Sequence, residues 1–432
     1  MKINPLRIDT SKRNYEKIIL SRTGINSNTN RKVQKEVDLI ISKIKKSGDK
    51  SLLSFIKKFD NYNIKNIKNI LITPNEIKKS YKYIDKYQLS NLKKSIKRIR
   101  DFSKKQKAMS WSNSKNGSIL GEKVTAIETV GIYVPAGKAS YPSTVLMNAI
   151  PAKIAGVENI IMACPISNIE DHALAIVAAD LCGVDKILRM GGAHAIAALA
   201  YGTNYIDKVD KIVGPGNIYV TLAKKAVFGD VGIDNIAGPS EVVIIADSTN
   251  NPDWVAMDLF SQAEHDELAQ PILISSNMKL INDVHKSVEK LLPQMLRKNI
   301  ILKSFNSRGI YIKTKNMREI ANIVNKIAPE HLEIMSKNKN DLIKLITNAG
   351  AIFLGEYTPE VFGDYCAGPN HVLPTSGSAR FSSPLGVYDF QKRSSLINIS
   401  RKTALELSKI SVSMALSEGL QAHALSAKYR DK

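Results

Sequence analysis

Residues 131–165 read GIYVPAGKASYPSTVLMNAIPAKIAGVENIIMACP. The stretch opens on a short apolar run, GIYVP, passes through a glycine-containing loop into a helical pattern, and closes on a second apolar run, NIIMACP. Two short apolar runs separated by a segment of helix length are typical of a strand–helix–strand unit. Such units join parallel strands through right-handed crossovers, so the stretch predicts a parallel sheet with helices packed on it.

The same alternation continues beyond this unit. Helical patterns separate the apolar runs DKILRM, VDKIVGPGN and EVVIIAD, the last of which covers residues 241–247. A second series follows, with the runs PILISS, GIYIKTK and AIFLG and helical patterns such as NPDWVAMDLFSQAEH at 251–265. The sequence therefore predicts an α/β protein, with ligands bound beyond the carboxyl ends of its strands.

A chain of 432 residues is too long for one compact core, so we expect more than one domain. We predict two Rossmann-like parallel-sheet domains with a small, polar N-terminal arm and a helical C-terminal tail. The expected ranges are 1–25 for the arm, 26–131 with 241–383 for a discontinuous first α/β domain, 132–240 for the second domain, and 384–432 for the tail.

Charge and cysteine content limit the class of protein. The formal net charge is +22, but lysines fill the polar side of a helical pattern whose apolar side is Leu92, Ile96 and Ile99, which favours solvated helix faces. Aromatic residues do not interleave with these charges, so we expect no nucleic-acid partner. The three cysteines lack paired spacing, and no signal sequence or membrane span is visible, which together predict a cytoplasmic protein.

Glycine-containing loops follow three of the predicted strands. They are Pro135-Ala136-Gly137, Gly191-Gly192 and the run from Gly214 to Asn217. The last begins like GxGxxG but has Tyr219 in place of the third glycine, so alone it is a weak dinucleotide signal. Tight strand–helix turns explain each loop equally well, although backbone amides at helix N-termini suit a pyrophosphate.

A set of polar residues has the character of metal ligands. Gln262 and His265 are three apart in a helical pattern and would share a face; Asp364, His371 and His423 lie further along. These side chains offer oxygen and nitrogen donors but no thiolate, which suits Zn²⁺, with Mn²⁺ or Co²⁺ as substitutes. An exposed polar face is the alternative for Gln262 and His265, because spacing alone cannot bring the set together.

The run Pro329-Glu330-His331 ends a helical pattern. A histidine is a natural general base near neutral pH, and a neighbouring carboxylate could tune it or activate a water. A solvated turn is the alternative interpretation.

Eight motifs, in this order, resemble those of histidinol dehydrogenases over residues 25 to 425. They are VGIYVPAG, GGAHAIAALAYGT, VDKIVGPGN, AGPSEV, LFSQAEH, APEHLE, GDYCAGPNHVLPT and DFQKR. The resemblance implies the zinc ligands Gln262, His265, Asp364 and His423, and the acid/base pair Glu330 and His331. It implies the substrate contacts Ser240, Gln262, His265, His331, Asp364, Glu418 and His423, with His371 beside the pocket. It implies cofactor contacts at Tyr133 and Asn217, and at His194, where the family usually has Gln.

The resemblance also implies a reaction and an assembly. Histidinol dehydrogenases oxidise L-histidinol through L-histidinaldehyde to L-histidine, the last step of histidine biosynthesis, using two NAD⁺ and one Zn²⁺ per subunit. His331 would be the general base and Glu330 would activate water. The family is a homodimer that exchanges segments, so Glu418 and His423 would complete the partner's site. A related zinc-linked dehydrogenase for another amino alcohol, a nucleic-acid-binding protein and a decayed enzyme are the alternatives.

Overall fold

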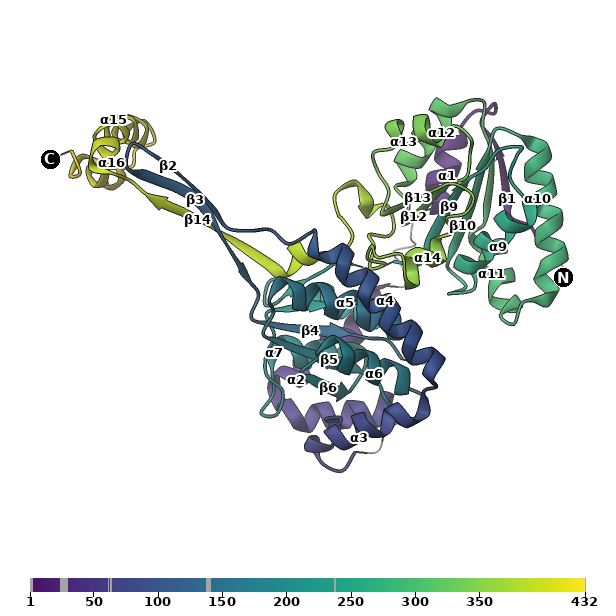
Figure 1. Cartoon of the computed structure of the whole chain (residues 1–432), viewed down its shortest axis with the longest axis horizontal. Helices are drawn as coiled ribbons and strands as arrows, with labels where there is room; N and C mark the ends of the chain where they lie inside the picture. The colour runs from purple at the N-terminus through teal and green to yellow at the C-terminus, as the bar shows by residue number, and fades with distance from the viewer. Residues whose placement is uncertain are drawn as a thin grey trace.

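One body of the molecule is built on a six-stranded, fully parallel sheet (Figure 1). In sheet order its strands are β1 (Leu6–Asp9), β11 (Ile310–Lys313), β10 (Gln270–Ser275), β9 (Glu241–Ile245), β12 (His331–Ile334) and β13 (Ala351–Leu354). The computed structural model describes residues 3–23, 30–60, 62, 64–136, 141–236 and 238–431.

Helices cover both faces of this sheet because its strands are apolar on both sides. In β9, Val242 packs with one cluster of helices and Val243 with the other, as the alternation of strand side chains requires. The first cluster contains α9 (Pro252–Ala263), α10 (Met278–Leu291) and α11 (Lys298–Arg308). The second contains α1 (Tyr15–Thr23), α12 (Met317–Ile327) and α13 (Lys339–Leu345).

The second body is a five-stranded parallel sheet, which the opening strand–helix–strand unit predicted. Its order is β6 (Lys186–Arg189), β5 (Asn159–Cys164), β4 (Thr129–Tyr133), β7 (Lys211–Val213) and β8 (Gly232–Ile233). The crossover helices are α5 (Pro142–Ala155), α6 (Ala173–Cys182), α7 (Gly192–Tyr201) and α8 (Ile218–Val227). Gly137, in the loop predicted after β4, lies outside the described residues.

The lysine-rich helices belong with this second sheet. Helix α2 (Asn30–Phe59) packs against α7 and α8, and α4 (Lys86–Lys104) packs against α5, while α3 (Pro74–Ser80) contacts α6. The sequence prediction had grouped residues 26–131 with 241–383 instead. The apolar stripe of each helix is covered by the five-stranded sheet's helices, which the spacing of the stripe could not reveal. The domain boundaries themselves stay a prediction.

The N-terminal residues are less peripheral than predicted. Strand β1 pairs with β11 at the edge of the six-stranded sheet, and Ile3, Ile8 and Ile19 are buried. In the described part of the chain, no helix is both long enough and apolar enough to cross a membrane.

A long antiparallel ribbon projects from the second body and carries the C-terminal helices at its far end (Figure 1). Its strands are β14 (Gln391–Asn398), β3 (Ser118–Ala126) and β2 (Trp111–Lys115). At the tip, α15 (Arg401–Ser417) packs on α16 (Gln421–Lys428). Large apolar side chains are exposed along this arm, namely Trp111, Leu120, Leu396, Ile397, Ile410, Met414, Leu416 and Leu420.

Candidate active site

A buried cluster of acidic and histidine side chains lies where β9 and β12 begin. Glu241 is the first residue of β9, and His331 is the first residue of β12, directly after Glu330. The sequence predicted ligand binding at the carboxyl ends of strands, whereas this cluster lies at the amino ends of β9 and β12. Ala328, with φ of 50°, ends α12 in the left-handed conformation, and Pro329 follows, so the chain turns abruptly into β12.

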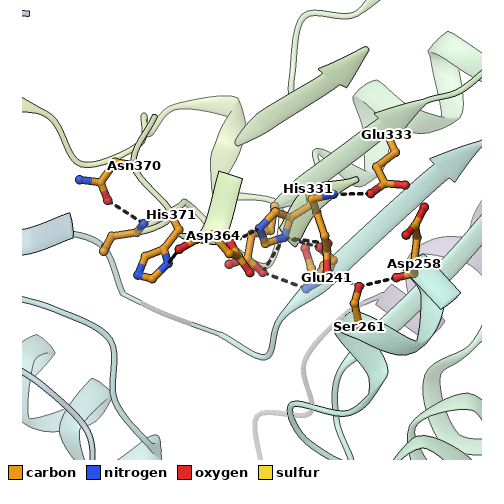
Figure 2. Close-up of polar contacts among 11 residues, drawn as sticks. Glu241, Asp258, Ser261, His331, Glu333, Asp364, Asn370 and His371 are labelled. Atoms are coloured by element: carbon orange, nitrogen blue, oxygen red, sulfur yellow. Dashed lines mark hydrogen bonds and ion pairs between the residues drawn. The ribbon is translucent and has the colours of Figure 1, made fainter. Parts of the chain in front are cut away.

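His331 is held in one orientation by backbone and carboxylate groups (Figure 2). Its Nδ1 lies 3.1 Å from the carbonyl oxygen of Glu241, which can only accept, so Nδ1 donates. Nε2 is buried without a hydrogen-bond partner and lies 3.6 Å from Oδ1 of Asp364. Burial lowers the pKa of His331, but the carboxylates of Glu330, Glu360 and Asp364 outweigh it and raise the pKa well above its usual value.

Glu330 is also fixed by β9. Its Oε2 accepts a hydrogen bond from the amide of Glu241 at 2.9 Å. Burial raises the pKa of Glu330 to about 7, which is the range of a carboxylate able to accept a proton near neutral pH.

Glu360 is a buried carboxylate that was not predicted from the sequence. It lies one turn before Asp364 on the short helix α14 (Glu360–Tyr365) and is 1% exposed. Ser261 Oγ donates to its Oε1 at 2.7 Å. The Gln262 amide is satisfied when its Nε2 donates to the two Glu360 oxygens at 3.1 and 2.8 Å. The i, i+4 spacing from Asp364 was the available signal.

Two further acidic residues lie behind this cluster. Oε1 of Glu333 accepts the amide of Glu360 at 2.7 Å, and its Oε2 has no hydrogen-bond partner. Burial raises the pKa of Asp258 to about 6, and burial together with Asp258 raises the pKa of Glu333 well above its usual value. Figure 2 shows Asp258 and Glu333 on the side of His331 away from His371.

His265 and His371 complete the open side of the cluster. Helix α9 ends at Ala263, so His265 lies in the turn after it rather than on the helix that the sequence predicted. The residue His265 is exposed. Desolvation by the surrounding protein nevertheless lowers the pKa of its ring, and the negative charge of Asp364 opposes this shift. His371 Nδ1 donates to the carbonyl of Asp364 at 3.0 Å.

The structure brings together Gln262, Glu330, His331, Asp364 and His371, with His265 close enough to interact electrostatically with Asp364. Ser240 directly precedes Glu241. Glu418 and His423 are not part of this group, because Glu418 directly follows α15 and His423 lies on α16, both exposed at the tip of the arm (Figure 1).

The donor set near Asp364 fits a borderline metal ion in chemistry. An amide oxygen, an imidazole and a carboxylate are available on Gln262, His265 and Asp364, and the neighbouring carboxylates favour positive charge. Within the described residues, however, no three His, Cys, Asp or Glu side chains are arranged to hold a metal ion.

The expected cofactor residues lie at the carboxyl edge of the five-stranded sheet. Tyr133 ends β4, and its buried hydroxyl accepts from the amide of Gly192 at 3.0 Å. Asn217 caps α8 by accepting from the amides of Tyr219 and Val220. Gly214 admits no side chain, since its φ is 114° and a Cβ would lie 2.1 Å from the Tyr133 carbonyl oxygen.

His194 behaves differently from these two. It is 1% exposed, and its Nε2 lies 2.9 Å from Oδ2 of Asp60, which follows α2. The same Oδ2 accepts the amide of Gly191 at 3.0 Å. Asp60 was missed from the sequence, because nothing local links it to a loop at residue 191.

Comparison with known proteins agrees with the motif order. A family model described as histidinol dehydrogenase matches residues 24–431. A histidinol dehydrogenase of Pseudomonas fluorescens (strain Pf0-1) is 50% identical over 394 residues, covering 91% of this chain and 89% of the relative. One from Cupriavidus pinatubonensis is 48% identical over 431 residues, covering 99% and 97%. The crystal structure of histidinol dehydrogenase from Elizabethkingia anophelis has a TM-score of 0.94 at 32% identity, covering 100% of this chain and 98% of that one.

Proposed function

The chain belongs to the histidinol dehydrogenase family of oxidoreductases, and from this premise we propose that it oxidises L-histidinol through L-histidinaldehyde to L-histidine with two NAD⁺ and one Zn²⁺ per subunit. We assign this activity to the last step of histidine biosynthesis, in the cytoplasm. The observation that carries the assignment is the buried contact between Glu241, Glu330 and His331, beside the carboxylate of Asp364.

His331 acts as the general base of the alcohol step. The surrounding carboxylates favour the protonated ring, so His331 must first lose the proton on Nε2 before it can act as a base. Since Nδ1 donates to the Glu241 carbonyl, the neutral ring then has its lone pair on Nε2, on the side of Asp364. A substrate hydroxyl at this position would give its proton to Nε2 as hydride leaves for the nicotinamide. The buried surroundings exclude competing water from the ring.

Glu330 acts in the second oxidation by accepting a proton from the water that attacks the aldehyde. The pKa of about 7 and the fixed orientation from the Glu241 amide support this role. A base of this kind beside His331 lets one pocket carry out both steps without releasing the aldehyde.

Gln262, His265, Asp364 and His423 are the residues we assign to Zn²⁺. When bound, the ion would hold the imidazole and amino nitrogens of the substrate and so orient its carbinol group. The contact between Gln262 and Glu360 supports this assignment. Because the amide nitrogen of Gln262 donates to Glu360, the amide oxygen is not used in that contact and remains available as a ligand. Ser240, Gln262, His265, His331, Asp364, Glu418 and His423 form the proposed substrate site.

Tyr133 and Asn217 are the proposed cofactor contacts, at one edge of the second sheet, and His194 stands at the third position that the family resemblance implies. We also propose the domain division 1–25, 26–131 with 241–383, 132–240 and 384–432, with NAD⁺ bound to the 132–240 part. The helices α2 and α4 pack with the five-stranded sheet, which favours assigning these two helices to the second domain instead of the first.

The active unit is a homodimer in which the arm of one chain completes the site of its partner. Two observations support it: Glu418 and His423 lie on the projecting arm, and the arm exposes large apolar side chains that a monomer would leave in water. In such a dimer, His423 on the exchanged arm would add an imidazole to the donors on Gln262, His265 and Asp364.

The decisive experiment is to measure NADH formed per L-histidinol consumed. We expect about two, because each hydride removes two of the four electrons lost by the alcohol. Dialysis against a chelator should abolish turnover, and added Zn²⁺ should restore it. A yield of one, or salt-sensitive nucleic-acid binding without NADH formation, would contradict the proposal; a higher rate with another amino alcohol would favour the related-dehydrogenase alternative.

A further inference from the structure

The loop that leads into α7 is held by two side chains from distant parts of the chain. Asp60 Oδ2 accepts the amide of Gly191 at 3.0 Å, and the hydroxyl of Tyr133 accepts the amide of Gly192 at 3.0 Å. A side chain at Gly191 would meet Pro165 at 2.8 Å and Asp60 Oδ1 at 3.1 Å, so the backbone is closely enclosed there. Both amides that open this helix are therefore engaged by protein.

In this arrangement the amides of Gly191 and Gly192 are not free to bind a phosphate group, which is a common role of glycine-rich loops. A free helix N-terminus attracts a pyrophosphate because its amides are unpaired. Here the amide of Gly191 already has a carboxylate partner, and that carboxylate would repel a second anion. The amide of Gly214 is likewise bound to Asp234 at 2.7 Å, and Asp234 forms a buried ion pair with Lys224. The amides of Gly191 and Gly214 are therefore already bonded within the protein and are not free to bind a pyrophosphate.

His194 is the partner that keeps Asp60 in place. An ionised carboxylate only accepts, so Nε2 of His194 donates to Oδ2 of Asp60 across 2.9 Å. The ring lies beside both Phe55 and Phe59, with its centroid 6.0 Å from each of theirs, and is 1% exposed. A nitrogen so enclosed and already donating has no free hydrogen for a ligand.

We infer that His194 is a positioning residue, which shapes the cofactor edge through Asp60 and the Gly191–Gly192 backbone and does not touch the cofactor. The path is short: His194 fixes Asp60, Asp60 fixes Gly191, and the next amide orients the Tyr133 hydroxyl. The inference rests on the proposed NAD⁺ site but not on the identity of the alcohol substrate.

The glutamine that the family usually has at this position should position Asp60 in the same way as His194. Gln and His both carry a terminal nitrogen donor at a similar reach from Cβ, so His194→Gln should keep the bond to Asp60. His194→Leu keeps much of the volume but removes the donor and leaves the buried carboxylate without it. Asp60→Ala removes the acceptor from the other side.

The test compares these variants and the double variant by NADH fluorescence titration of the full-length enzyme, together with kcat and the KM for NAD⁺. We expect His194→Leu and Asp60→Ala each to weaken NADH binding and raise this KM by about tenfold, with a smaller change in kcat. The first leaves the Asp60 carboxylate without a donor, and the second leaves the Gly191 amide and the His194 ring without their acceptor. The double variant should resemble either single one, and His194→Gln should stay within about twofold of the wild type.

His172→Leu is the matched control. His172 is also buried and starts the helix after the neighbouring strand β5, with Nδ1 3.1 Å from the Asn168 carbonyl. Its replacement should lower the melting temperature without changing NADH affinity, which separates general destabilisation from positioning.

Three results would overturn the inference: multiplied effects in the double variant, normal NADH affinity in His194→Leu, or a defect in His194→Leu that Asp60→Ala lacks. Each would show that His194 acts without Asp60 or not at all. The titration needs no alcohol substrate. A wild-type enzyme that binds NADH but does not oxidise L-histidinol would therefore contradict the substrate assignment and leave the inference about His194 intact. A wild type that fails to bind NADH would overturn both.

Discussion

The backbone carbonyl of Glu241 lies 3.1 Å from Nδ1 of His331, and this contact sets which ring nitrogen is free. A carbonyl cannot donate, so the proton stays on Nδ1 and the lone pair of the neutral ring stays on Nε2. Figure 2 shows the ring between Glu241 and Asp364, on two neighbouring strands and a short helix. The tautomer is therefore a property of the pairing between β9 and β12.

His331→Asn should lower kcat by about 10²–10⁴-fold, because it removes the proton acceptor, while the protein keeps its zinc. His265→Asn should instead lose zinc, measured by metal analysis after dialysis, and recover part of its activity in excess Zn²⁺. His285→Asn, on the remote helix α10, is the control and should match the wild type in both respects. Full zinc content and full turnover in His265→Asn would show that this residue is not a ligand.

Mixing two inactive variants should restore activity if sites are shared between chains. In a mixed dimer of His331→Asn and His423→Asn, one site carries both changes and the other carries neither. After unfolding and refolding together, about a quarter of wild-type activity should return. Mixing His331→Asn with Glu330→Gln, which lie on the same body, should return none and serves as the control. No recovery in the first mixture would contradict the exchanged arm.

Glu360→Ala should weaken zinc binding by about tenfold, because the Gln262 amide loses the acceptor that orients it. The measurement is a competition titration against a chromophoric chelator, which needs no turnover. Glu356→Ala, just before the same helix, also removes a glutamate side chain and should bind zinc normally. Equal zinc affinity in Glu360→Ala and the wild type would dismiss the orienting role.

Asp258→Asn should stabilise the protein at pH 8 more than at pH 5. Burial raises the pKa of Asp258 to about 6, so the folded state favours the protonated form, and this stabilisation is lost as the pH rises through 6. Asparagine cannot ionise, so it removes that loss, and its amide can donate to Glu333. We expect the free energy of unfolding at pH 8 to rise by about 1 kcal/mol. Urea unfolding at the two pH values measures it.

Asp253→Asn, near the start of the same helix, is the opposite case. Hydrogen bonds with Ser287 and Lys290 lower the pKa of its carboxyl group, so replacement should bring no gain in stability at pH 8. A gain for Asp253→Asn equal to that for Asp258→Asn would mean that net charge, rather than burial, controls the effect.

Sequence periodicity predicted the strands well where apolar runs are short and bounded. GIYVP became β4 and EVVIIAD became β9, because strands buried on both faces need continuous apolar runs. The motif resemblance also supplied Gln262, Glu330, His331 and Asp364, which the fold brings into one cluster.

The rest depended on contacts between distant residues. Glu360 is a carboxylate in an ordinary polar segment, and only the packing of α14 against α9 makes it a partner of Gln262. The ribbon was missed because β3 and β14 are half-polar strands far apart in sequence. Asp60 and His194 meet for the same reason, across separate elements.

The pairing of β1 with β11, and of β3 with β14, has a consequence for the order in which the chain matures on the ribosome. The five strands from Thr129 to Ile233 are all present early and need no later residue to complete their sheet. Strand β1 must wait until Ile310–Lys313 has been translated, and β3 must wait for Gln391–Asn398. Strand β1 thus stays unpaired until residue 313 has been made, and one edge of β3 stays unpaired until residue 398, so chaperone protection matters over the later part of synthesis.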